Sequence, residues 1–142
     1  MTDNGDRRTI LVVDDEPHVV AYLEMLLQDQ GYATASAANG REGLEKAKAG
    51  RPNLICLDIT MPEESGVRMY RNLREDPELA SIPVLVVTAV TGLGGDPEPF
   101  KNFLNTRKHT PPPEAFFSKP IEREKFIEKV NQLLARTVVA AQ

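Results

Sequence analysis

The chain is poor in several features whose scarcity limits what it can be. Its 142 residues include one cysteine, Cys56, so no internal disulfide can form, and we expect a buried, reduced thiol. No stretch approaches the roughly 20 apolar residues of a membrane-spanning helix, and the polar residues 1–8 lack the apolar core of a signal peptide. The net charge of −4, without a basic stripe, argues against nucleic-acid binding. We therefore expect a cytoplasmic protein with neither nucleic-acid nor membrane partners.

Length and composition favour a single globular domain. A chain of 142 residues with 41% hydrophobic and 27% charged residues can bury a substantial core, but it leaves little room for a second domain. We predict a flexible N-terminus over residues 1–8, one domain over residues 9–136 and a C-terminal tail over residues 137–142.

Short apolar runs alternate with segments of helical periodicity along the chain, a pattern typical of βαβ units and a parallel sheet. The runs predict strands at 9–13, 54–57, 84–87 and 115–118, and a weaker strand at 32–37. Apolar residues at helical spacing predict helices at about 17–30, 39–49, 65–74 and 121–136. The sequence therefore indicates the α/β class.

One segment, residues 91–114, breaks this regularity. It contains three glycines and a proline triplet at 111–113, which favours a stiff, extended connection. Prolines on both sides would confine a possible helix to about residues 98–107. We interpret the segment as an irregular insertion, most simply a loosely packed loop.

Chemically useful residues follow four of the predicted strands. If the strands are parallel, these ends share one edge of the sheet, where open α/β sheets place their sites. Each residue also has a plain structural explanation as a turn or a helix cap, and the joint pattern is what points to function. The residues are Asp14 and Asp15 after the first strand, Asp58 after 54–57, Thr88 after 84–87 and Lys119 after 115–118.

These residues suit the binding of Mg²⁺ and the transfer of a phosphoryl group. Adjacent carboxylates repel unless a cation lies between them, and Mg²⁺ prefers oxygen ligands. Asp58 is either a third metal ligand, a nucleophile that forms an acyl phosphate, or both. The hydroxyl of Thr88 and the ammonium of Lys119 would contact the phosphoryl oxygens.

The sequence resembles the receiver domain of bacterial two-component response regulators over residues 9–136. The motifs that carry the resemblance are ILVVDDEP at 10–17, LDITMP at 57–62, Gly66, Thr88-Ala89 and Lys119-Pro120. The resemblance implies a doubly wound, five-stranded parallel sheet of the flavodoxin-like or CheY-like type. The spacing from Thr88 to Lys119 is longer than the family's, so the insertion at 91–114 would replace or distort the fourth helix.

The resemblance also implies a role for each site residue. Asp58 would be the phosphoacceptor, and Mg²⁺ would be held by Asp14, Asp15, Asp58 and the backbone carbonyl of Thr60. Thr88 and Lys119 would contact the phosphoryl group, which would couple its arrival to a change of shape.

Two further features follow from the same resemblance. Phe116 would occupy the aromatic switch position and would respond to Thr88, the other switch residue. A role as an ordinary core residue of a strand explains Phe116 equally well. The Lys119–Pro120 peptide bond would be cis, which only proline tolerates at low cost.

The implied function is a phosphoacceptor signalling module rather than a metabolic enzyme, with slow autodephosphorylation as its only hydrolysis. Its donor would be a histidine kinase or a histidine phosphotransfer protein, and its target an unknown downstream protein. One alternative is a constitutive protein-binding module that has lost phosphorylation. A phosphohydrolase is disfavoured because Thr60 stands where a second acid would be needed. With no output domain after residue 136, we expect either a stand-alone receiver or a receiver cut from a longer protein, and Met1 favours a natural N-terminus.

Overall fold

A computed structural model of the chain describes residues 8–61, 65–89 and 113–141. Within them, five parallel strands form one sheet in the order β2-β1-β3-β4-β5. The strands are β1 (Thr9–Val13), β2 (Ala33–Ala37), β3 (Leu54–Asp58), β4 (Val84–Ala89) and β5 (Ala115–Lys119). The helices are α1 (Pro17–Asp29), α2 (Gly40–Gly50), α3 (Ser65–Glu75) and α5 (Arg123–Ala141).

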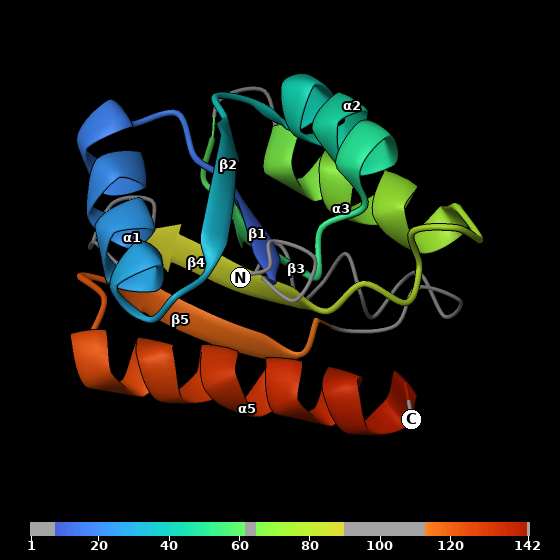
Figure 1. The fold of residues 1–142 in the computed structure, drawn as a ribbon. Coiled ribbons are helices and arrows are strands. Elements are labelled where there is room, and N and C mark those ends of the chain that lie inside the picture. Colours follow the sequence, from blue (N-terminus) through green and yellow to red (C-terminus); the bar gives the residue numbers. More distant parts are fainter. Residues whose placement is uncertain (1–7, 62–64, 90–112, 142) are drawn as a thin grey trace.

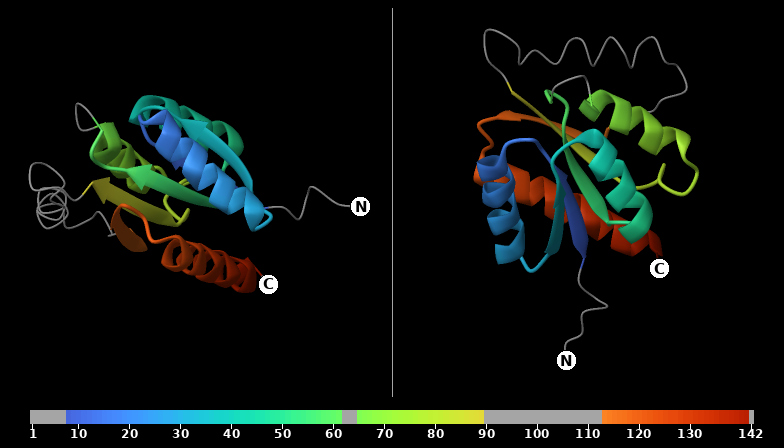
Figure 2. Two further views of the ribbon diagram at one scale, coloured as in Figure 1. Left: turned by 90° about the vertical axis from the view of Figure 1, so that its left-hand side faces the viewer. Right: turned by 90° about the horizontal axis from the view of Figure 1, so that it is seen from above.

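The helices cover both faces of the sheet (Figure 1). Helices α1 and α5 lie on one face, and α2 and α3 lie together on the other, as the turned views in Figure 2 also show. Among the described residues, no helix combines the length and the apolar character that crossing a membrane requires.

Alternating side chains of the inner strands pack into two apolar cores, one on each face of the sheet. In β1, Leu11 and Val13 face the core beneath α2 and α3, whereas Ile10 and Val12 face the core beneath α1 and α5. Strands β3 and β4 divide their residues in the same way. A parallel strand buried on both faces is expected to read as a continuous apolar run, which explains why these strands stand out in the sequence.

The structure confirms the doubly wound, five-stranded parallel sheet. The weak strand at 32–37 is present because β2 pairs with β1, from Thr9↔Ala33 to Val13↔Ala37, and this long-range pairing compensates for its poor propensity. The cis peptide bond at Lys119–Pro120 is also confirmed. Residues 91–112 of the predicted insertion, with the possible helix at 98–107, fall outside the described residues.

The last helix differs from its predicted bounds at both ends. It begins at Arg123 rather than at residue 121, and it continues to Ala141 rather than ending at residue 136. Most of the residues assigned to a tail are therefore helical. The apolar periodicity that marks the buried face stops at Leu134, so periodicity alone could not show where the helix ends.

Helix α2 begins with the capping pattern that its sequence predicts. The side chain of Asn39 accepts a hydrogen bond of 2.8 Å from the backbone N–H of Glu42. The carboxylate of Glu42 in turn accepts a bond of 2.8 Å from the N–H of Ala38. Two donors at the start of the helix are thereby satisfied, which fixes where α2 leaves the sheet edge.

A buried arginine side chain joins the elements at the other end of the sheet, where β4 and β5 begin. The side chain of Arg74 is 3% exposed and pairs with Glu114 at 2.9 Å. Its Nη1 also donates to the carbonyls of Ala80 and Ile82, at 2.8 and 3.1 Å. Glu114 accepts a second bond of 2.7 Å from the N–H of Val84. This network joins α3, the turn before β4 and the start of β5.

Two glycines allow backbone segments to pack against each other beside the sheet edge. A Cβ atom at Gly40 would lie 2.1 Å from the carbonyl oxygen of Ser65, and one at Gly66 would lie 2.2 Å from the carbonyl oxygen of Asp58. Both neighbours are backbone atoms, so neither can move aside cheaply. Gly66 therefore lets α3 begin directly against the end of β3.

The close approach at Gly66 predicts a large cost for a single methyl group. Gly66→Ala should lower the free energy of unfolding by about 1–3 kcal/mol, the usual cost of overpacking. Gly50 in α2, whose added Cβ would meet nothing within 4 Å, is the matched control. Gly50→Ala should raise stability by about 0.5–1 kcal/mol. Urea denaturation of both variants measures these changes, and equal stabilities would contradict the close packing.

The single cysteine is buried at the centre of β3. Cys56 is 1% exposed and packs in the core beneath α1 and α5. Burial raises the pKa of its thiol from 9.0 to about 12, because the thiolate would lose its hydration. The expectation of a buried, reduced thiol is confirmed.

This raised pKa makes stability fall in alkali. The unfolded thiol ionises above pH 9 and the folded thiol only near 12, so the contribution of Cys56 is complete below pH 9 and is lost as the pH rises toward 12. Wild type should lose about 2 kcal/mol more than Cys56→Ala between pH 8 and pH 10.5. Denaturation at both pH values measures the difference, and equal losses would show that Cys56 is not the source.

Candidate functional site

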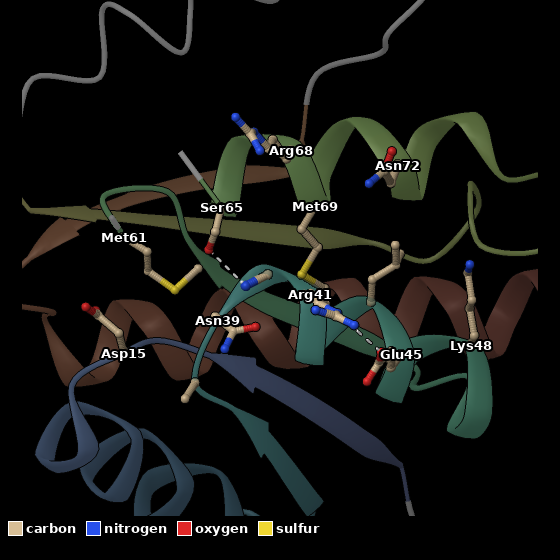
Figure 3. A pocket seen from close by; sticks show the side chains of 13 residues that line it. Asp15, Asn39, Arg41, Glu45, Lys48, Met61, Ser65, Arg68, Met69 and Asn72 are labelled. Carbon is tan, nitrogen blue, oxygen red and sulfur yellow. Dashed lines mark hydrogen bonds and ion pairs between the residues drawn. The ribbon is translucent and has the colours of Figure 1, made fainter. Parts of the chain in front are cut away.

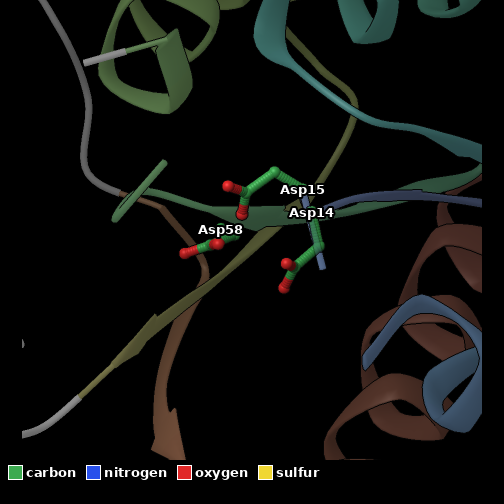
Figure 4. Close-up of side chains that lie close together, drawn as sticks. All are labelled: Asp14, Asp15 and Asp58. Carbon is green, nitrogen blue, oxygen red and sulfur yellow. The ribbon is translucent and has the colours of Figure 1, made fainter. Parts of the chain in front are cut away.

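Three carboxylates from two neighbouring strands meet at one edge of the sheet (Figure 4). Asp14 and Asp15 follow β1, and Asp58 is the last residue of β3. Because β1 and β3 are parallel, with Val13 opposite Leu57, their ends lie side by side. One oxygen from each carboxylate lies within 4.8 Å of the other two. The convergence of these three residues, predicted from the strand ends, is observed.

The ammonium of Lys119 lies among these carboxylates. Lys119 ends β5, two strands away from β3 in the sheet, and its side chain is 16% exposed. Its Nζ lies 3.0 Å from Asp14 Oδ2 and 3.5 Å from Asp58 Oδ2. The amine therefore reaches both buried acids, as the sequence predicted for this strand end.

Burial and charge oppose each other at Asp14. Asp14 and Asp58 are 3% and 2% exposed. Burial raises the pKa of Asp14, and the negative charge of Asp58 raises it further. The hydrogen bond from the N–H of Glu16 and the Lys119 ammonium both lower it. The net change in the pKa of Asp14 is upward. For Lys119, burial lowers the pKa, but the attraction of Asp58 and Asp14 outweighs it, so the net change is upward. The site thus stabilises the cationic form of Lys119.

Hydrogen bonds from Thr60 hold the Asp58 carboxylate in place. Asp58 Oδ1 accepts bonds from the backbone N–H of Thr60 at 2.8 Å and from its hydroxyl at 2.5 Å. Asp58 Oδ2 is left facing Lys119. The two ends of the carboxylate are therefore distinct, with one oxygen fixed by its own loop and the other directed toward the cation.

Glu16 contacts Lys119, although its place in the sequence did not mark it as a site residue. Its Oε1 lies 3.2 Å from Lys119 Nζ, and its backbone N–H donates a 2.9 Å bond to Asp14 Oδ1. Glu16 is the N-cap residue of α1, yet its side chain makes no capping hydrogen bond. The only signal in the sequence was its position directly after Asp14 and Asp15, which does not reveal a contact with a strand 103 positions away.

The remaining predicted residues are placed less fully. Thr88 lies in β4 with its backbone opposite Ser118, but its side chain is outside the described residues. Phe116 lies in β5 opposite Val86, and it is 39% exposed. A plain core residue therefore does not describe Phe116, because a core phenylalanine would be buried.

A cavity of about 720 Å³ lies beside the acidic cluster, between α2 and α3 (Figure 3). Asp15 stands at one end of it, and apolar side chains, including Met61 and Met69, form part of its wall. Charged side chains line the rest, among them Arg41, which pairs with Glu45 at 3.8 Å. The cavity connects the edge that carries the carboxylates with the outer surface of two helices.

The donor set fits a hard divalent cation. Three carboxylates offer oxygen ligands, which Mg²⁺ prefers. Asp14 Oδ2 is buried and has no hydrogen bond of good geometry, so it retains capacity for a ligand bond. The exposed Asp15 leaves the cluster open on one side for water or a phosphate oxygen.

Comparisons with known proteins identify close sequence relatives. Residues 10–96 match the model of the response regulator receiver domain. The polar-differentiation response regulator DivK of Brucella anthropi is 35% identical over 127 residues, which cover 89% of this chain and 96% of that protein. DivK of Brucella ovis is 34% identical over the same length.

Solved structures share the fold. A putative response regulator from Chloroflexus aurantiacus superposes with a TM-score of 0.75 at 25% identity, covering 92% of this chain and 99% of that one. The signal receiver domain of a signal transduction histidine kinase from Syntrophus aciditrophicus gives a TM-score of 0.74 at 30% identity, with 90% of each chain covered.

Proposed function

The chain belongs to the family of response regulator receiver domains, and we propose that it accepts a phosphoryl group on Asp58 in a two-component system or phosphorelay. The observation that carries this proposal is the arrangement around Asp58. A carboxylate oxygen of the buried Asp58 lies within 4.8 Å of one from Asp14 and one from Asp15. The Nζ atom of Lys119 lies 3.5 Å from Asp58 Oδ2. Such a set favours an anionic group that arrives with a metal ion.

Mg²⁺ would be held by Asp14, Asp15, Asp58 and the backbone carbonyl of Thr60. When bound, the ion supplies positive charge that offsets the negative charge of the phosphoryl oxygens. Asp15 is the exposed member of the set, so a metal with its water shell has an open path to it. The buried Asp14 Oδ2, which lies 3.0 Å from Lys119 Nζ, would offer the ion one carboxylate ligand.

The transfer forms one bond and breaks one. An oxygen of the Asp58 carboxylate attacks phosphorus, and the bond from phosphorus to the donor atom breaks with its electron pair leaving on the donor. For a phosphohistidine donor, the leaving group is an imidazole nitrogen. The bonds from Thr60 to Asp58 Oδ1 orient the carboxylate, and Lys119 supplies an ammonium for the transferred group.

The phosphoryl group would act as a switch through β4 and β5. Thr88 would donate its hydroxyl to a phosphoryl oxygen, and Phe116 would respond as the partly exposed aromatic residue of the neighbouring strand. Their backbone positions are diagonal neighbours, since Thr88 pairs with Ser118 and Val86 with Phe116. A small shift at the site would thus change a surface that a downstream protein reads.

The partners follow from this chemistry. The donor would be a histidine kinase or a histidine phosphotransfer protein, and the downstream protein would recognise the switched surface in the cytoplasm. The domain is a signalling module, and its only hydrolysis would be slow loss of the phosphoryl group from Asp58. Thr60 lies within hydrogen-bond distance of Asp58 and brings no second acid for fast phosphohydrolase chemistry.

Acetyl phosphate, a small phosphoryl donor, tests the proposal directly. With Mg²⁺, intact-mass measurement should show one added phosphoryl group on wild type and none on Asp58→Asn. Asp29→Asn, on α1, is the matched control and should be labelled like wild type. Labelling should fall to background with EDTA.

Two results would contradict the assignment. An adduct that survives in Asp58→Asn would place the acceptor elsewhere. A complete lack of labelling in a folded wild type, by acetyl phosphate and by phosphorylated histidine donors alike, would favour the alternative of a constitutive binding module.

Metal binding should appear as a gain in stability. Mg²⁺ at a hundred-fold excess over its Kd should stabilise wild type by about 2.7 kcal/mol. Asp15→Asn should lose this response, and without Mg²⁺ it should be at least as stable as wild type because one repelling charge is gone. Thermal unfolding with Mg²⁺ and with Na⁺ at equal ionic strength measures both effects. An unchanged Mg²⁺ response in Asp15→Asn would remove Asp15 from the ligand set.

A further inference from the structure

Glu16 holds the amine on which the proposed chemistry depends. The carboxylate of Glu16 lies 3.2 Å from Lys119 Nζ, closer than the 3.5 Å that separates this amine from Asp58. An N-cap residue ordinarily uses a side-chain oxygen to accept a hydrogen bond from its own helix. Glu16 makes no such bond, and its side chain reaches across to β5 instead.

Three carboxylates share the Lys119 ammonium in the resting site. Asp14, Glu16 and Asp58 lie 3.0, 3.2 and 3.5 Å from Lys119 Nζ. The ammonium donates a hydrogen bond to Glu16 Oε1, whereas its contacts with the buried Asp14 and Asp58 are ion pairs. A phosphoryl group on Asp58 brings further anionic oxygens, which compete with Glu16 for the donor hydrogens of Lys119.

The exposure of the three acids decides which partner leaves. The side chains of Asp14 and Asp58 are each 2% exposed, whereas that of Glu16 is 49% exposed. A buried carboxylate that loses its cation has no water to replace it, and this loss is costly. A half-exposed carboxylate regains water at once, and its ion pair contributes little.

We infer that Glu16 is a positioning residue that retains Lys119 in the resting site and releases it when a phosphoryl group occupies Asp58. This inference rests on the proposed function. Glu16 competes with the phosphoryl oxygens for one ammonium, so its carboxylate lowers the affinity of the site for the phosphorylated state. Removal of this competitor shifts the balance toward that state.

Two variants separate the contact from the charge. Glu16→Gln removes the negative charge. Glu16→Asp keeps the charge near the site but is one methylene shorter, so it loses its reach to Lys119. Aspartate is also a preferred N-cap residue, so Glu16→Asp should be as stable as wild type or more stable. Glu24→Gln, on α1, is the control for net charge.

The probe is beryllofluoride, which mimics a phosphoryl group on a carboxylate, added at saturating Mg²⁺ and followed by ¹H–¹⁵N NMR. Both Glu16 variants should bind it about 1.4- to 5-fold more tightly than wild type, the range expected from loss of one partly exposed ion pair. Glu24→Gln should bind like wild type. In the resting protein, amine acetylation followed by mass spectrometry should modify Lys119 faster in both Glu16 variants, with Lys48 as the internal reference.

Each other outcome overturns the inference. Tighter binding by Glu16→Gln alone would show a field effect of the charge rather than a contact. Unchanged or weaker binding by both variants, or unchanged Lys119 acetylation, would show that Glu16 does not hold the amine. If wild type takes up no beryllofluoride and resembles Asp58→Asn, the proposed function fails and the release fails with it, while acetylation still reports the resting contact.

Discussion

The Lys119 ammonium determines whether the acidic edge of this sheet can exist. Asp14 and Asp58 are almost fully buried, and like charges in such a setting are unstable without a cation. The chain supplies that cation from β5, although the acids belong to β1 and β3. The order of the strands therefore matters to the charge balance as much as to the core, because only a parallel β5 ends with its lysine at the same edge.

The rest of the scaffold brings these groups to a fixed separation. Parallel pairing sets Val13 opposite Leu57, Asp58 opposite Val87 and Ala89 opposite Lys119, so Lys119 lies two register positions beyond Asp58 on the same side of the sheet. Gly66 then allows α3 to begin in contact with the carbonyl of Asp58. At the other end of these strands, Glu114 pairs with Arg74 and accepts a hydrogen bond from Val84, which holds the starts of β4 and β5 together. The site thus depends on contacts at both ends of the same strands.

The sequence predicted what is local or periodic, and it missed what depends on long-range contacts. Strands β1, β3 and β4, which are buried on both faces, were evident from continuous apolar runs, and the ends of the apolar runs, including the run of β5, pointed to Asp14, Asp15, Asp58 and Lys119. The weak strand β2 was plausible only through its neighbours. The contact of Glu16 with Lys119 was not predictable, because a charged residue after a strand looks the same whether it faces water or another strand. The end of α5 beyond Leu134 was missed because the apolar pattern stops there.

Strand β5 is the element through which a charge at this site would reach the surface. It is an edge strand, paired with β4 alone within the described sheet, so it is less constrained than β1, β3 or β4. It also carries both Lys119, which contacts three carboxylates, and Phe116, which is partly exposed. A phosphoryl group on Asp58 would attract Lys119 on β5 as well as Thr88 on β4, and β5 is the less constrained of these two strands. Because one edge strand carries both the cation of the site and a partly exposed ring, a movement of Lys119 would alter the surface around Phe116.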